Sequence, residues 1–296
     1  MKKSIRVHII PTYKSNQNDI YNFFNQFYTN EKNLDLVWLN NSLDELDKKF
    51  VVSKYEIEGG EISLLSDFYF ELLYNLLKIH CKKIITTTNF INFNKGIINL
   101  SDIINVNYNF NVHEALNQQI FKNIKAAVSS NKIINIKTVD ISLKNDEIKN
   151  INILNNLSIK SWEIIPYFNS KDYTIFEEIV KKYLKYTKMM KFAFHNELQL
   201  KNILNLNNFE TFDVYLLPEN KFGLTIFENN QLTLKKFDNV DLLIKKLSEM
   251  EILHDNYCEK CTSKIKCMSN YFFNHTYKGK SCSGFKNLIT DFENKE

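Results

Sequence analysis

The sequence predicts an α/β fold in which a partial (β/α)6-type barrel is followed by a smaller C-terminal region. Short runs rich in β-branched residues alternate with helical stretches through the first two-thirds of the chain, as in right-handed β-α-β units around a parallel sheet. Roughly six such units fit before residue 200, fewer than the eight of a closed barrel. After residue 205 the pattern changes to short strands separated by turn residues, which indicates hairpins.

The elements of the barrel are expected in a regular order. The run SIRVHIIP predicts the first strand, and the stretch at 65–81 predicts a helix because its apolar residues recur at helical spacing. The run 34–40 fits either a strand or a short helix. The remaining β-branched runs predict strands, and the longer apolar-periodic stretches predict helices. The expected strands are 4–11, 54–58, 84–88, 103–109, 131–141 and 161–166, and the expected helices are 20–29, 42–49, 65–81, 113–129, 146–156 and 174–187.

The C-terminal third predicts a separate unit. Hairpin strands are expected at 212–217, 224–227 and 232–237, with turn residues between them, and a helix at 241–254. We therefore expect two domains, residues 1–205 and residues 206–296, the second containing a cluster of cysteines.

Composition excludes several classes of function. The chain of 296 residues is 44% hydrophobic and 24% charged, as in globular proteins and not in disordered ones. Its net charge of +4 comes almost wholly from lysine, Arg6 being the sole arginine, which does not favour nucleic-acid binding. No apolar run approaches the roughly 18 residues of a membrane span, and no signal peptide is evident. We expect a cytoplasmic protein with no membrane partner.

Four cysteines lie close together near the C-terminus, namely Cys258, Cys261, Cys267 and Cys282. A C-x2-C pair directs two thiolates at one metal ion, and two further thiolates complete a tetrahedral set. In a reducing compartment such a cluster binds metal more often than it forms disulfides. Neighbouring lysines lower the thiol pKa and favour thiolate. The spacing alone fits both a structural zinc and a [4Fe–4S] cluster.

A Gly-Gly-Glu sequence, Gly59, Gly60 and Glu61, follows the second expected strand. Two glycines at a strand end let a ligand approach the backbone, and a carboxylate accepts hydrogen bonds from an ammonium group. Together with the four cysteines, this sequence resembles the radical SAM enzymes that carry a C-terminal SPASM domain. The resemblance covers nearly the whole chain and implies a partial barrel followed by a SPASM-like metal-binding domain.

The resemblance assigns roles to particular positions. In that family Gly-Gly-Glu holds the methionyl amino group of S-adenosylmethionine, and the matching residues here are Gly59, Gly60 and Glu61. The sequence at 84–89 (IITTTN) resembles the third strand, which ends in Thr-Asn, and 106–111 followed by His113 resembles the fourth. The four C-terminal cysteines match the ligands of an outer auxiliary [4Fe–4S] cluster. Tyr271 stands where a ligand of an inner cluster would be, so we expect one cluster only.

The chain departs from the family in the loop after the first strand. There the family has C-x3-C-x2-C, whose three thiolates leave one iron open to chelate S-adenosylmethionine, whereas residues 11–20 of this chain contain no cysteine. The resemblance without these ligands implies a pseudoenzyme that has lost radical chemistry. Binding of S-adenosylmethionine is in doubt, and no catalytic residue is assigned.

The first hypothesis is therefore a non-catalytic accessory protein in ribosomal peptide modification. It would bind a precursor peptide, an active radical SAM maturase, or both, and exposed hairpin edges such as 224–237 would pair with an extended peptide. Two alternatives remain open: an enzyme that uses the remaining cluster for electron transfer or the barrel for non-radical chemistry, and a zinc-stapled binding module.

Overall fold

The computed structural model describes most of the chain at the level of individual residues. The described ranges are 2–16, 32–143, 146–167, 173–204, 211–228, 231–252 and 285–294. Within them, strands and helices alternate around a strongly curved, ten-stranded sheet with the order β10-β9-β8-β1-β2-β3-β4-β5-β6-β7. All neighbouring pairs from β8 through β1 to β7 are parallel, which confirms the predicted α/β class.

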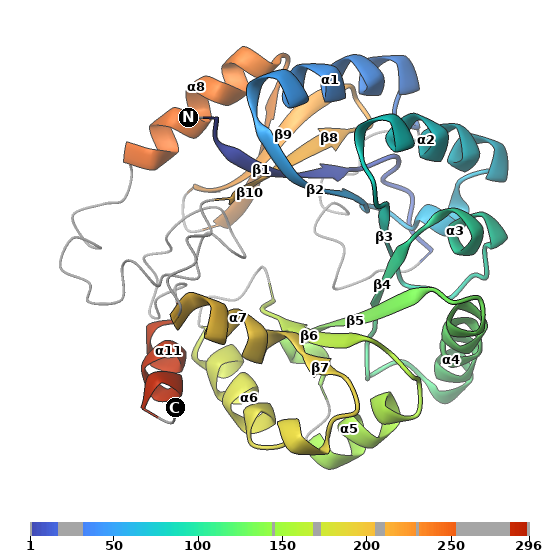
Figure 1. Cartoon of the computed structure of the whole chain (residues 1–296), viewed down its shortest axis with the longest axis vertical. Helices are drawn as coiled ribbons and strands as arrows, with labels where there is room; N and C mark the ends of the chain where they lie inside the picture. The colour runs from blue at the N-terminus through green and yellow to red at the C-terminus, as the bar shows by residue number, and fades with distance from the viewer. Residues whose placement is uncertain are drawn as a thin grey trace.

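The sheet curves into a barrel that does not close (Figure 1). Its end strands are β10 and β7, which are not paired with each other. The strands are β1 (Ser4–Ile9), β2 (Val51–Ile57), β3 (Ile85–Thr88), β4 (Ile103–Asn107), β5 (Ile133–Val139), β6 (Ser161–Ile165), β7 (Ala193–Phe194), β8 (Thr211–Leu217), β9 (Lys221–Glu228) and β10 (Gln231–Phe237).

Helices form the outer layer around the sheet (Figure 1). They are α1 (Leu36–Lys49), α2 (Asp67–His80), α3 (Lys95–Leu100), α4 (Glu114–Ser129), α5 (Glu147–Asn155), α6 (Thr174–Leu184), α7 (His195–Leu204), α8 (Val240–Ile252) and α11 (Lys286–Glu293). Short 3-10 turns occur at Ile62–Leu64, Asp140–Ser142 and Thr187–Met189. None of the helices within the described ranges is long and apolar enough to cross a membrane.

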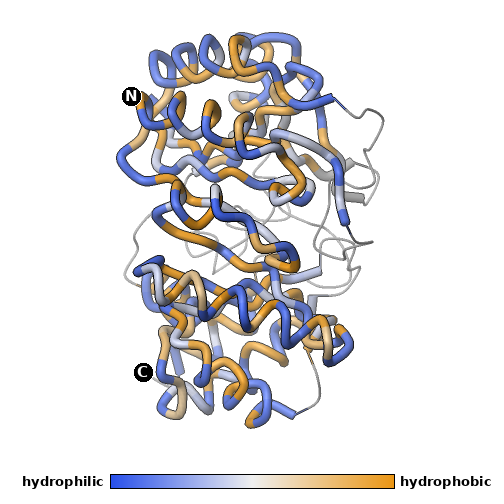
Figure 2. The backbone as a smooth tube through the Cα atoms, turned by 90° about the vertical axis from the view of Figure 1, so that its right-hand side faces the viewer, coloured by the Kyte–Doolittle hydropathy of each residue, from blue (hydrophilic) through white to orange (hydrophobic). Residues whose placement is uncertain are grey.

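The core lies between the helices and the outer face of the sheet. In β1, Ile5, Val7 and Ile9 are fully buried, while the residues between them are only partly so. Because side chains alternate across a strand, these apolar residues pack against the helices and the intervening ones face the barrel interior. Along the helices the backbone alternates between hydrophobic and hydrophilic segments (Figure 2), as helices that cover a sheet on one side do. The interior is thereby left to polar side chains.

Most predicted elements are present among the described residues. The run 34–40 is helical and belongs to α1, where Asp35 caps the helix by accepting hydrogen bonds from Val37 N and Trp38 N. Helices α3, α7 and α11 and the two-residue strand β7 were not expected. The helix predicted at 20–29 lies outside the described residues, as do most of 253–296.

The strands after residue 205 extend the barrel sheet. Strand β8 runs parallel to β1 over its full length, with Ser4 opposite Thr211 and Ile9 opposite Leu216. Strands β9 and β10 then form the predicted antiparallel hairpins. The expected domain division near residue 205 thus does not interrupt the sheet. It is this pairing that brings residues of β8 to the first two strands.

Candidate functional site

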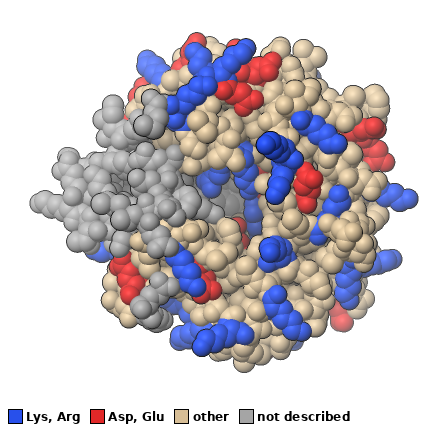
Figure 3. All heavy atoms as spheres, viewed as in Figure 1, with Lys and Arg blue, Asp and Glu red and all other residues tan. Residues whose placement is uncertain are grey.

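Charged side chains gather inside the barrel, on the face of the sheet turned away from the helices. The centre of the molecule is hollowed, and Lys and Arg side chains line the hollow (Figure 3). A barrel interior is more commonly filled with layers of branched apolar side chains. The polar interior of this chain is therefore the candidate functional site.

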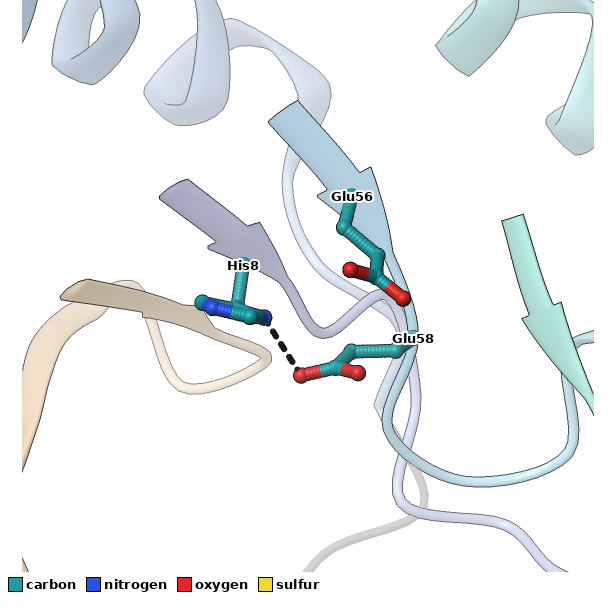
Figure 4. A group of neighbouring side chains, drawn as sticks. All are labelled: His8, Glu56 and Glu58. Carbon is teal, nitrogen blue, oxygen red and sulfur yellow. Dashed lines mark ion pairs between the residues drawn. The ribbon is translucent and has the colours of Figure 1, made fainter. Parts of the chain in front are cut away.

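Residues of β8, β1 and β2 form a row of ion pairs across the sheet. Arg6 lies opposite Asp213 in the β1–β8 register, and its Nε and Nη2 donate to the two carboxylate oxygens of Asp213 at 2.6 and 2.8 Å. His8 Nε2 lies 2.9 Å from Asp213 Oδ1. His8 Nδ1 lies 2.6 Å from Glu58 Oε1, just beyond the end of β2 (Figure 4). The row thus connects Glu58 and Asp213, which are more than 150 residues apart in the sequence.

The two carboxylates keep His8 protonated. Burial alone would lower the pKa of His8, but the charges of Glu58 and Asp213 outweigh it and raise that pKa from 6.5 to about 9. The ring also stacks on Tyr215, with the ring centroids 4.9 Å apart. The Arg6 and His8 cations likewise hold the pKa of Asp213 below its ordinary value against the opposing effect of burial. At neutral pH the row is a set of charged pairs.

Glu56 is the centre of a second cluster, one that spans strands β2 to β5. Its carboxylate is buried and accepts hydrogen bonds from four groups: Lys54 Nζ at 2.5 Å, Asn105 Nδ2 at 2.7 Å, Lys137 Nζ at 3.0 Å and the hydroxyl of Thr87. Burial opposes ionisation, but the Lys137 and Lys54 ammonium groups prevail and hold the pKa of Glu56 well below its usual range. Removing this carboxylate would leave buried cations unpaired.

His8, Glu56 and Glu58 together have the composition of a metal site, since their potential ligand atoms lie within 4.8 Å of one another (Figure 4). The residues do not fit this role well. The Glu56 carboxylate already has four hydrogen-bond donors, two of them cationic, and His8 carries a proton that a metal ion would have to displace. The group is better described as an ion-pair network that stabilises the barrel interior.

The Gly-Gly-Glu backbone is held against the loop that follows β1. Gly60 N donates to Thr12 O at 2.9 Å, and Glu61 N donates to Lys14 O at 2.6 Å. A Cβ atom on Gly60 would lie 2.2 Å from Lys14 O, so only glycine allows this approach. Gly59 has a φ of +120°, which also favours glycine. The two glycines therefore have a structural role in packing one loop on another.

The Glu61 side chain is turned into the protein, with 3% of its surface exposed. It accepts hydrogen bonds from Ser63 N at 3.0 Å, from Thr88 Oγ1 at 2.5 Å and from Asn89 N at 2.8 Å. Thr88 and Asn89 are the Thr-Asn pair at the end of the third strand that the sequence singled out. The Glu61 carboxylate thus connects the turn after β2 to the end of β3 through hydrogen bonds.

This arrangement does not fit S-adenosylmethionine as the resemblance would place it. The N–H groups of Gly60 and Glu61 donate to the β1 loop, and the buried Glu61 carboxylate that would accept from a methionyl ammonium group already accepts hydrogen bonds within the chain. The described part of the β1 loop, up to residue 16, contributes no cysteine. Cys258, Cys261, Cys267 and Cys282 lie outside the described residues, so their geometry is not part of this site. Cys81, at the end of α2, is the sole cysteine within the described ranges, and burial raises its pKa to about 11.

The sequence motif identified Gly59, Gly60 and Glu61, and the 84–89 run that contains Thr88 and Asn89, but not the charged clusters around His8 and Glu56. Asp213 and Lys137 were not selected, because each is a single charged residue in an otherwise ordinary strand. One signal in the sequence could have identified part of the site. In the run SIRVHI, Arg6 and His8 alternate with the apolar residues, so they lie on the face of the strand opposite the buried apolar one.

Comparisons with solved structures show which proteins share this fold. The structure of anSMEcpe with bound AdoMet matches with a TM-score of 0.69 and 11% sequence identity, covering 98% of this chain and 96% of that chain. Streptococcus suis SuiB bound to precursor peptide SuiA matches with a TM-score of 0.55 and 14% identity, covering 75% of this chain and 59% of SuiB. At these identities the likeness is one of fold. No known protein-family model matches the chain.

One curated protein has detectable sequence similarity. The endonuclease SceI small subunit of Saccharomyces cerevisiae is 25% identical over 206 residues, which are 66% of this chain and 40% of the yeast protein. The chain thus spans about two-fifths of that relative's length. Similarity of this extent transfers no activity to this chain.

Proposed function

We propose that this chain is a non-catalytic relative of the radical SAM/SPASM peptide maturases. It holds one [4Fe–4S] cluster and acts as an accessory protein that binds a precursor peptide or an active maturase. The fold that it shares over its full length with anSMEcpe is one on which AdoMet binds, and SuiB, of the same fold, is bound to precursor peptide SuiA. These likenesses support the family and the peptide partner.

The observation that carries the loss of catalysis is the closed Gly-Gly-Glu turn. The amides of Gly60 and Glu61 are bonded to the β1 loop, and the buried Glu61 carboxylate accepts hydrogen bonds from Ser63 N, Thr88 Oγ1 and Asn89 N. Opening this turn for a ligand would cost several buried hydrogen bonds. The same β1 loop lacks the three thiolates that a catalytic cluster needs.

The cluster is assigned to Cys258, Cys261, Cys267 and Cys282, whose spacing matches the outer auxiliary site of the family. Four thiolates complete the coordination of a [4Fe–4S] cluster and leave no open iron. Such a cluster would stabilise the C-terminal segment and supply no site for substrate. No step of a reaction is assigned to it.

The peptide site is assigned to the edge of the sheet at β10. β10 pairs with β9 on one side, and within the described residues no strand pairs with its other side. An edge strand offers its free N–H and C=O groups to an extended peptide. The exposed Lys235 on this strand adds positive charge, which favours a peptide with acidic residues.

Hydrogen exchange with the anaerobically purified full chain tests this proposal. The probe is the synthetic precursor peptide encoded nearest to the gene, with a scrambled peptide as the control. Bound peptide is expected to slow amide exchange in 231–237 and to leave 133–139 of the central strand β5 unchanged. An AdoMet cleavage assay under reducing conditions is expected to give no 5′-deoxyadenosine above the rate without protein.

Two results would contradict the proposal. Release of 5′-deoxyadenosine by the chain would show that radical chemistry is retained. No affinity for any peptide or maturase encoded beside the gene would remove the accessory role.

A further inference from the structure

Helix α2 carries a row of apolar side chains on its outer surface. Phe68 is 72% exposed, Leu72 43% and Ile79 77%. With Asn75 between them, they are spaced by four, three and four residues, so they lie on one face of the helix. The opposite face buries Phe70, Leu73, Tyr74 and Leu77 in the core.

The position of α2 makes this row accessible. The helix is part of the outer ring, between α1 and α3 (Figure 1). Val37 of the neighbouring helix α1 is another large apolar side chain that is mostly exposed, at 73%. Adjacent exposed apolar side chains mark interaction surfaces more often than single ones do.

The charges beside the row indicate what covers it. Glu71 and Lys78 are both exposed and lie on the same flank of the row, because seven residues are close to two helical turns. Lys78 Nζ lies over the Tyr74 ring, 4.7 Å from its centroid, which holds the cation on this flank. The acidic residue is toward the N-terminal end of α2 and the basic one toward its C-terminal end.

This order is self-complementary for an antiparallel copy of the same helix. A twofold axis near residues 73 and 74 places Phe68 opposite Ile79 and Leu72 opposite Asn75. The same axis places Glu71 opposite the level of residue 76, two residues or roughly 3 Å along the helix from the partner subunit's Lys78, a gap that these long side chains can span. The charged flank is thus centred within about one residue of the apolar row, close enough for the isologous contact of a twofold dimer.

We propose that α2 is a homodimer contact in which two copies of this chain pack their α2 helices antiparallel. Phe68, Leu72 and Ile79 form its apolar centre. Glu71 of one copy pairs with the partner subunit's Lys78, and the reverse pair follows by symmetry.

The area available sets the strength of the contact. From side-chain areas of about 150–250 Å², the exposed parts of Phe68, Leu72 and Ile79 offer on the order of 300 Å² per copy. A standard interface buries about 800 Å² per partner, so neighbouring side chains must contribute. We therefore expect a weak dimer whose dissociation constant depends on salt.

Sedimentation equilibrium of the full chain tests the proposal. The mass is expected to rise from 35.1 kDa toward twice that value with concentration. Ile79→Glu is expected to raise the dimer dissociation constant by at least about tenfold, since it places charge in the apolar centre. Leu242→Glu, at an apolar residue of α8 that is 46% exposed, is the control and leaves the constant unchanged.

A charge exchange separates this contact from other modes of association. E71K and K78E are each expected to raise the dissociation constant about two- to tenfold at low salt, and E71K/K78E to restore it. Circular dichroism melts confirm that all variants fold. Three results would each overturn the proposal. The first is a wild-type mass that stays at 35.1 kDa up to roughly millimolar concentration. The others are an unchanged dissociation constant in Ile79→Glu, or a dissociation constant of E71K/K78E no lower than those of the single variants.

Discussion

Raising the pH from 6 to 9 should destabilise this protein through His8. The ring is clamped between Glu58 and Asp213, at 2.6 and 2.9 Å, which raises its pKa from 6.5 to about 9. A group whose pKa is higher in the folded state contributes stability that is complete below its unfolded pKa and is lost as pH rises through its folded pKa. The window of loss is therefore pH 6.5 to 9.

The magnitude follows from the size of the shift. One pKa unit corresponds to 1.36 kcal/mol, so a shift from 6.5 to about 9 corresponds to about 3 kcal/mol of folding free energy. The side chain is only 12% exposed, so solvent screens this contribution little. In a protein of ordinary stability this is a large fraction of the total.

Urea unfolding at pH 6 and pH 9 measures this effect. The free energy of unfolding of the wild type is expected to fall by about 3 kcal/mol between the two. In His8→Gln the side chain stays polar but cannot be protonated. The free energy of unfolding of this variant should therefore be lower than that of the wild type at pH 6 and should change little between pH 6 and pH 9. Two results would refute the ion-pair description of the barrel interior: a wild-type free energy of unfolding that is equal at both pH values, or a pH dependence in His8→Gln as steep as that of the wild type.

Three further predictions concern the same elements. Glu56→Gln leaves the Lys54 and Lys137 ammonium groups without a counter-charge and should cost about 3–5 kcal/mol of unfolding free energy. Glu178→Gln, at an exposed residue of α6, should cost under about 0.5 kcal/mol. Calorimetry distinguishes the two, and similar losses would contradict the assigned role of Glu56. Gly60→Ala places a methyl group 2.2 Å from a backbone oxygen and should cost about 1–3 kcal/mol. Gly96→Ala in α3 should cost less, because its methyl group comes no closer than 3.0 Å, to the Asn94 side chain, and helix propensity is gained. Isothermal titration with S-adenosylmethionine should give no heat of binding, and a dissociation constant below roughly millimolar would show that the Gly-Gly-Glu turn opens.

The sequence predicted the regular part of the barrel because local patterns determine it. Alternation in 4–9 and helical spacing in 65–81 each reflect one buried face, and both elements are present as β1 and α2. Helix α1 was ambiguous over 34–40, since LDLVWLN also suits a strand, and the Asp35 cap decides for the helix. Helix α3 was missed because six residues give too few turns to show a period.

The candidate site could be predicted only in part because its partners are distant in sequence. Arg6 and Asp213 meet through the pairing of β1 with β8, and Glu56 and Lys137 meet across the barrel interior. Neither contact follows from a local pattern. Gly59, Gly60 and Glu61 were found from their motif, but the bonds from Thr88 and Asn89 that occupy Glu61 depend on how β2 and β3 pair.

The metal content of the full chain tests most directly whether one cluster is retained and the catalytic one is lost. Iron, acid-labile sulfide and zinc should be counted in the full chain after anaerobic purification, with Cys258→Ser/Cys261→Ser as the matched variant. About four irons and four sulfides are expected per chain, and both are expected to be lost in the variant. Nearly eight irons would show that a second cluster binds, and about one zinc would show a structural metal site instead; either result would contradict the claim.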